Sequence, residues 1–169
     1  MPTETGRGVQ DVLIFRTSNH RCAILASRIS ELVLMPALIR LPAQPAILDG
    51  FLNLRGKAVP VVPLDRLFES DAPAPALYAP LVVIETSEGP LALRVEAVEE
   101  VVAVDLESMV SATASDSLNG CAEAQFQWLE QAVAMLSTEQ LLLKKEETCV
   151  AALQAQAQAR LESLESGRP

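Results

Sequence analysis

The sequence predicts a fold built mainly from short β-strands. Short runs rich in Val, Ile and Phe alternate with turn-forming residues, which is typical of strands joined by tight turns. A pair of such runs just beyond residue 80 mirrors a pair near the N-terminus. Prolines exclude a long helix between 36 and 64, because proline lacks the amide hydrogen that a helix interior needs. They stand at positions 36, 42, 45, 60 and 63.

The length and composition place the chain among ordinary globular proteins. Its 169 residues suit one domain or two small intertwined ones, and 50% are hydrophobic against 21% charged. No apolar stretch approaches the roughly 20 residues of a bilayer span, and the first ten residues hold no secretory signal, so we expect a cytoplasmic protein. The cysteines are odd in number and lack CxxC spacing, which predicts reduced structural thiols.

The first half of the chain reads as strands and turns. Residues 11–17 and 20–25 predict a hairpin around Ser18-Asn19. Ala26, Ile29 and Val33 are spaced three and four apart, which predicts one or two helical turns with Ser27 as the N-cap.

Farther along the first half, residues 50–62 predict a strand, a turn at Arg55-Gly56-Lys57 and a second strand, followed by a short helix over 65–68. The Pro/Ala-rich stretch 70–80 predicts a surface connection that divides the chain.

The second half repeats the hairpin and ends differently. Residues 81–85 and 91–95 predict a hairpin, and 96–104 a further strand, followed by a loop over 105–117 with at most one helical turn. Residues 118–123 and 128–136 predict a third strand pair around 124–127, although the second member could also be helical. Ser137-Thr138 followed by Glu139 and Gln140 predicts a helix start, and residues 146–166 continue with an apolar face at helical spacing.

The residue inventory argues against an enzyme. The single histidine, His20, sits beside Asn19 in a predicted turn, with no partner that it could activate as a nucleophile. There is no GxGxxG or GxxxxGK[ST] phosphate loop, and no residue pattern predicts a metal or another cofactor. Residues 1–80 carry eight basic and seven acidic groups, and 81–169 carry five and fifteen, so nucleic acid is not an expected partner. The sequence therefore favours a binding protein.

One local sequence resembles a known family. Residues 49–67, DGFLNLRGKAVPVVPLDRL, match the pattern of a glycine, an NLRG turn, a valine-proline strand and a short helix found in the CheW family of chemotaxis adaptors. Weaker echoes are ISELV at 29–33, as the preceding helix, and LALRVEAVEEVV at 91–102. The resemblance covers residues 12–145, most of the chain.

The resemblance implies a fold and a domain organisation. The expected fold is all-β: two packed five-stranded SH3-like β-barrels with short helices and a C-terminal helix. Residues 1–10 would be a flexible tail, residues 11–145 the CheW-like adaptor domain with a connection between its two subdomains near 70–80, and residues 146–169 a helical extension. This extension has no clear counterpart in the family. Its apolar face is too thin to fold alone, so we expect it to dock, on the second half of its own chain rather than on a second copy, or else to fray.

The resemblance also implies a function without catalysis. The chain would be a scaffold that couples the cytoplasmic tip of a chemoreceptor to the regulatory domain of a CheA-type histidine kinase, with no cofactor and no membrane insertion. Glu31 and Arg55 would form an ion pair on the receptor-facing surface, and apolar barrel ends would hold the kinase. The other interface residues carried over on the motif are Gly50, Asn53, Leu54 and Gly56.

Departures from the family pattern leave the pathway open. Pro63 replaces the aspartate that commonly follows the valine-proline strand, and His20-Arg21-Cys22 alters the first hairpin. The chain could serve chemotaxis, a pili or surface-sensing system built from the same parts, or a diverged scaffold. A rival function is a β-barrel that binds a small ligand in its interior, although barrels of this size are filled by side chains.

Overall fold

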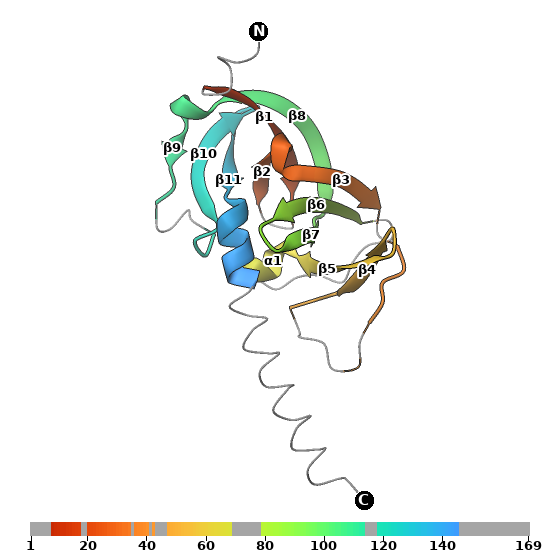
Figure 1. The fold of residues 1–169 in the computed structure, drawn as a ribbon. Coiled ribbons are helices and arrows are strands. Elements are labelled where there is room, and N and C mark those ends of the chain that lie inside the picture. The colour runs from red at the N-terminus through yellow and green to blue at the C-terminus, as the bar shows by residue number, and fades with distance from the viewer. Residues whose placement is uncertain are drawn as a thin grey trace, which may run out of the picture.

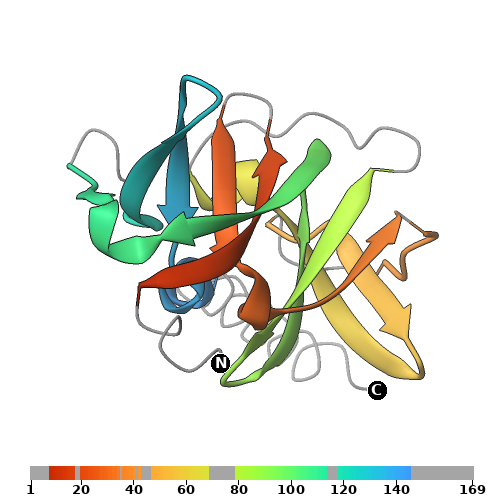
Figure 2. The same ribbon diagram turned by 90° about the horizontal axis from the view of Figure 1, so that it is seen from above.

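A computed structural model of the chain describes residues 8–17, 20–34, 36–40, 42, 47–68, 79–113 and 118–145. Within these ranges the chain forms two curled β-sheets that lie side by side (Figures 1 and 2). This confirms the all-β fold of two packed SH3-like barrels. The first sheet has a sixth strand of two residues in addition to the five expected.

The six-stranded sheet combines both ends of the described chain. Its strands, in spatial order, are β8 (Ala97–Asp105), β1 (Val9–Arg16), β2 (Arg21–Leu25), β11 (Gln131–Leu136), β10 (Ala122–Trp128) and β9 (Val110–Ser111). Neighbours are antiparallel except β2 and β11, which run parallel. We call this sheet the first barrel.

The five-stranded sheet takes the middle of the chain. Its strands, in spatial order, are β3 (Ile29–Leu34), β6 (Pro80–Thr86), β7 (Gly89–Arg94), β5 (Lys57–Pro63) and β4 (Gly50–Leu54). Only β5 and β7 are parallel. Short helices connect the strands: 3-10 turns at Ala26–Arg28 and Leu106–Ser108, α1 (Leu64–Leu67), and a helix over 138–145. We call this sheet the second barrel.

The two barrels exchange one strand each. After the hairpin β1–β2, strand β3 crosses to the second barrel and pairs with β6; after the hairpin β6–β7, strand β8 crosses to the first barrel and pairs with β1 (Figure 2). Residues 70–80 therefore separate two halves of the chain, whereas each barrel contains strands from both halves.

The exchange gives the fold an internal repeat that extends to single residues. The hairpins β4–β5 and β10–β11 join their sheets in the same way, through the parallel contacts of β5 and β11. In the second barrel, residues paired from one strand to the next form a row: Glu31, Val83, Ala92, Val61 and Gly50. The equivalent row across the first barrel runs Glu100, Ile14, Ala23, Met135 and Ala124. Even the β-bulges coincide, between Ile29 and Glu31 on β3 and opposite Ile14 and Phe15 on β8.

Alternating side chains divide the core into three parts. On β1, Val12 and Ile14 fill the first barrel, whereas Leu13 and Phe15 pack between the barrels. On β6, Leu81 and Val83 fill the second barrel, and its intervening residues pack between the barrels. Because both faces of these strands are buried, their sequences are continuously apolar.

Two local predictions are wrong. Residues 29–34 form strand β3, not helix, and the helical part is limited to Ala26–Arg28, where Ser27 is not the N-cap. A spacing of four residues fits a helix and a strand equally well, because residues four apart, such as Ile29 and Val33, lie on the same face in either structure. The third hairpin turns at Leu129-Glu130, not at 124–127. Its first strand, β10, begins at Ala122 rather than at 118 and runs through the predicted turn, and residues 118–121 form a turn instead of a strand. Neither residue of the hairpin turn at 129–130 is glycine or asparagine, so the sequence carries no signal for it.

Most other local predictions are confirmed. The first two hairpins, the strand–turn–strand over 50–62 and the short helix near 65–68 are present. The Gln140 amide donates to the Ser137 hydroxyl at 3.3 Å, which caps the helix over 138–145 as the sequence predicts. Of the predicted tail at 1–10, residues 9 and 10 belong to β1, and residues 1–7 lie outside the described residues. Most of the connection at 70–80 and the extension at 146–169 also lie outside them.

Candidate partner-binding surface

A two-residue turn joins β4 to β5 and presents the motif carried by the NLRG sequence. Leu54 pairs with Lys57, and the two residues between them have positive φ, 51° at Arg55 and 86° at Gly56. Such a turn needs left-handed backbone at both positions, which glycine adopts without strain. The Gly56 amide donates to Asn53 Oδ1 at 2.9 Å. The turn therefore holds the Arg55 backbone in a fixed position.

Arg55 makes an ion pair across the second barrel. Its Nη2 atom lies 2.8 Å from Glu31 Oε2 on β3. The hydrogen bond that Arg55 donates to Glu31, and then the negative charge of Glu31, raise the pKa of Arg55 above its ordinary value. Because β3 and β4 are the outermost strands of this sheet, the pair links its two edges. The arginine side chain remains 74% exposed, so most of the guanidinium faces solvent.

Gly50 supports the hairpin by allowing the chain to pack closely against β4. A Cβ atom at Gly50 would lie 2.9 Å from the Ile39 carbonyl oxygen and 3.0 Å from Leu38 Cβ. Ile39 and Phe51 exchange two backbone hydrogen bonds of 2.8 Å at this point. A side chain at position 50 would push the 38–40 segment away from β4. Gly50 therefore supports this surface from behind.

A buried ion pair holds the start of β4. Arg94 Nε on β7 lies 2.5 Å from Asp49 Oδ2, and Arg66 Nη1 on α1 lies 3.9 Å from Asp49 Oδ1. These residues were not among the site residues predicted from the sequence. The signal that could have revealed them is Arg94 itself, a charge at the end of the apolar run LALRV, since a buried charge requires a partner.

Apolar side chains are exposed on β3, the strand that carries Glu31, on the face opposite to Glu31. Leu32 and Leu34, on the same strand as Glu31, are 49% and 61% exposed. We call the set of Glu31, Leu32, Leu34, Asn53, Arg55 and Gly56 the tip surface. Leu54 differs from the other motif residues, because it packs against the core of the second barrel. The tip surface thus combines an exposed guanidinium on a rigid turn with aliphatic groups on β3, the strand that carries its ion-pair partner.

The thiols and the histidine are part of the packed structure. Cys22 and Cys121 are buried and free, and burial raises the pKa of Cys121 to about 11 and that of Cys22 further. His20 is half-buried, with its ring edge-on to Phe68 at 5.9 Å between centroids, rather than fully exposed in a turn. Within the described ranges, no three His, Cys, Asp or Glu side chains gather as a metal site would require.

Comparison with known proteins identifies the family. The profile of the CheW-like domain matches residues 11–146, most of the chain. The chain belongs to the CheW-like family. Among solved structures, it is similar to the scaffolding protein CheW of Thermoanaerobacter tengcongensis, with a TM-score of 0.69 and 19% sequence identity. That alignment covers 76% of this chain and 88% of the other. A search of curated protein sequences finds no significant match.

Family membership gives this CheW-like chain a general role. It is an adaptor or scaffold domain of chemotaxis-type signal transduction, in a family of non-catalytic proteins. The ion pair between Glu31 and Arg55, which the family resemblance implied, is present, although Glu31 lies on a strand rather than a helix. In the part of the chain that the structure describes, no helix has the length and apolar character needed to cross a membrane.

Proposed function

We propose that this protein couples a chemoreceptor to a CheA-type histidine kinase in the cytoplasm, and that the tip surface binds the receptor. The observation that carries the proposal is the exposed guanidinium of Arg55, held by a rigid turn and by Glu31, on a strand that also exposes Leu32 and Leu34. A guanidinium offers five donors, and the pair with Glu31 occupies only part of them. The remaining donors can bind a carboxylate or backbone carbonyl of a partner, while the leucines supply apolar contact.

The kinase would bind elsewhere on the barrels. Apolar residues are exposed on the first barrel as well, Val101 at 54% and Leu129 at 71%. Under the proposal, these groups contact the kinase regulatory domain, so receptor and kinase can bind at the same time. A pili or surface-sensing pathway built from related proteins is the alternative setting, and it would use the same surfaces. The rival small-ligand function receives no support from the interior of the second barrel, because side chains fill it.

Calorimetry with purified receptor and kinase fragments from the same genome tests the proposal. Binding of both partners is expected, and no detectable binding of either at high micromolar concentration would contradict it. Arg55→Glu should weaken receptor binding at least tenfold and leave the circular dichroism spectrum unchanged, because an exposed ion pair contributes little to stability. Arg28→Glu is the matched control, since Arg28 forms an exposed pair with Glu139 at 3.3 Å.

A charge swap separates recognition from local support. The double variant Glu31→Arg with Arg55→Glu keeps an ion pair between the same positions but reverses its direction. If the partner recognises the guanidinium at position 55, receptor binding stays weak in the double variant. If the ion pair only holds the two edge strands of the barrel together, the swap restores receptor binding. The tip surface is then not the recognition site.

A further inference from the structure

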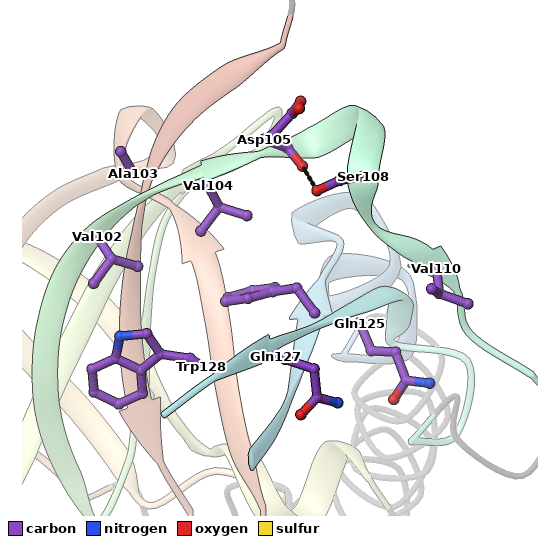
Figure 3. A pocket seen from close by; sticks show the side chains of 10 residues that line it. Val102, Ala103, Val104, Asp105, Ser108, Val110, Gln125, Gln127 and Trp128 are labelled. Atoms are coloured by element: carbon purple, nitrogen blue, oxygen red, sulfur yellow. Dashed lines mark hydrogen bonds between the residues drawn. The ribbon is translucent and has the colours of Figure 1, made fainter. Parts of the chain in front are cut away.

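The first barrel has an open seam between two of its strands. Strand β8 lies at one edge of the six-stranded sheet, and β9 covers the opposite edge only at Ala124 and Gln125 of β10. Between β8 and β10 the sheet leaves a cavity of about 500 Å³. Figure 3 shows Val102, Val104 and Trp128 around this space. The residues that line the cavity include the apolar Val102, Val104, Phe126 and Trp128 and the acidic Asp105.

The equivalent seam in the second barrel is bridged by an ion pair. There, Ile39 pairs with Phe51 of β4, as Val110 pairs with Gln125 of β10. The ion pair between Glu31 and Arg55 then links the strands beyond that point. In the first barrel the internal repeat places Leu129 at the position of Arg55, so the linking ion pair has no counterpart there. The seam therefore stays open where its repeat is bridged.

The open seam exposes backbone that a further strand could use. Among the described residues, β8 has no strand partner on the edge opposite β1, and residues 126–128 of β10 have none on the edge opposite β11. Strand β9 already lies against β10 in extended conformation, so its direction marks the path that an added strand would continue. Unpaired strand edges of this kind are the sites at which extended peptides join a sheet.

The lining of the seam indicates the chemistry of such a peptide. Four apolar side chains pack against the core of the first barrel and form the bottom of the seam, which we call its floor: Val102, Val104, Phe126 and Trp128. The sequence contains no lysine, arginine or histidine between Arg94 and Lys144, whereas this stretch includes Glu100, Asp105, Glu107 and Glu130 on and beside the seam strands.

One basic residue from outside that stretch approaches the seam. Arg21 lies over the Trp128 ring at 5.5 Å and bonds Glu99 at 2.6 Å, so its charge is already matched by a carboxylate. Other carboxylates near the seam lie on β8, in the following 3-10 turn and in the β10–β11 turn. They favour a ligand that carries positive charge.

We propose that the seam between β8 and β10 binds an extended basic segment of a partner protein as an added strand. Every second side chain of the segment would lie on the apolar floor, and the alternating lysines or arginines would face the carboxylates on the rim. The segment would complete the first barrel in the way that the ion pair completes the second. This binding site goes beyond the receptor and kinase surfaces proposed above and does not depend on them.

A designed peptide tests the seam directly. The probe is a blocked seven-residue peptide of alternating lysine and valine, added to the full chain labelled with ¹⁵N. We expect amide shift changes concentrated at residues 101–105 and 125–128, and an affinity that falls severalfold between low and physiological salt. Two control peptides should bind at least tenfold more weakly: one with glutamate in place of lysine, and one with alternate backbone amides methylated.

A charge variant supplies the second test. Glu107→Lys should reduce affinity for the basic peptide at least threefold, because Glu107 is exposed in the 3-10 turn that follows β8, at the rim that the lysines would face. Glu88→Lys, in the exposed β6–β7 turn, is the matched control and should leave affinity unchanged. The proposal is overturned if the methylated peptide binds equally well, if shift changes fall outside the seam, or if sedimentation shows that a second copy of the chain occupies it.

Discussion

Asp49 and Arg94 form a buried ion pair, with 2.5 Å between Oδ2 and Nε and side chains only 8% and 7% exposed. The pair joins the residue before β4 to the last residue of β7, and so it fixes the strand that carries the hairpin of the tip surface. Burial makes each charge dependent on the other, since an unmatched charge in the interior is costly.

Asn at position 49 should therefore destabilise the protein strongly. Asp49→Asn removes the negative charge and leaves the Arg94 guanidinium buried, for which we expect a loss of about 3 kcal/mol in the free energy of unfolding. Urea denaturation followed by circular dichroism measures it. Glu96→Gln, in the exposed pair with Arg16, is the control and should change stability by less than about 1 kcal/mol. A loss for Asp49→Asn no larger than that of the control would contradict the structural role.

A glycine-containing turn between β10 and β11 should stabilise the chain. Leu129 and Glu130 adopt φ of 50° and 64°, a left-handed conformation that costs non-glycine residues roughly 1 kcal/mol each. Replacing the two residues with Asn-Gly should raise Tm by about 2–4 °C. Gly56→Ala, in the equivalent turn of the second barrel, should lower it. Calorimetry on both variants would refute the strain argument if the shifts had the same sign.

Glutamine at position 123 should stabilise the protein at neutral pH. Burial, and secondarily the charge of Glu139, raise the pKa of Glu123, so the folded state holds this proton more tightly than the unfolded state. Stability is therefore lost as pH rises from the unfolded pKa through the folded pKa. Glu123→Gln should raise Tm at pH 7 and leave it almost unchanged at pH 3. A gain of equal size at both pH values would show that the charge is not responsible.

The described cysteines should resist alkylation in the folded state. Because the pKa of Cys121 is about 11, only about 0.1% of this thiol is ionised at pH 8, and burial also blocks access. Peptide mapping after iodoacetamide treatment should find Cys22 and Cys121 unmodified in native buffer and modified in guanidinium chloride. Rapid native labelling of Cys121 would mean that the segment before β10 opens readily.

Sequence reasoning predicted the parts of the fold in which local signals and tertiary structure agree. The Arg55-Gly56 turn is one example, because glycine marks the position that needs positive φ. The first two hairpins are others, since their apolar runs are short and bounded by polar turns. The helix start at Ser137 was also predictable, because capping depends on residues close in sequence.

The rest depended on contacts between distant segments. The β10–β11 turn is imposed by the pairing of β10 with β9 and of β11 with β2, against the local preferences of Leu129 and Glu130. Strand β3 was misassigned because its period of four fits two structures, and only pairing with β6 selects one. Of the candidate site, the motif residues of the hairpin were predicted through the family resemblance. Leu32, Leu34 and the ion pair at Asp49 required the structure.

Because the barrels exchange strands, neither half of the chain contains all the strands of either barrel. A cut after Phe68 would leave β3, β4 and β5 on one fragment and their partners β6 and β7 on the other. The first barrel would be divided in the same way, with β1 and β2 separated from β8 and β11. Neither fragment contains a full sheet, so we expect the protein to unfold as one cooperative unit. Two cleaved fragments mixed together should associate and reassemble the native pair of barrels.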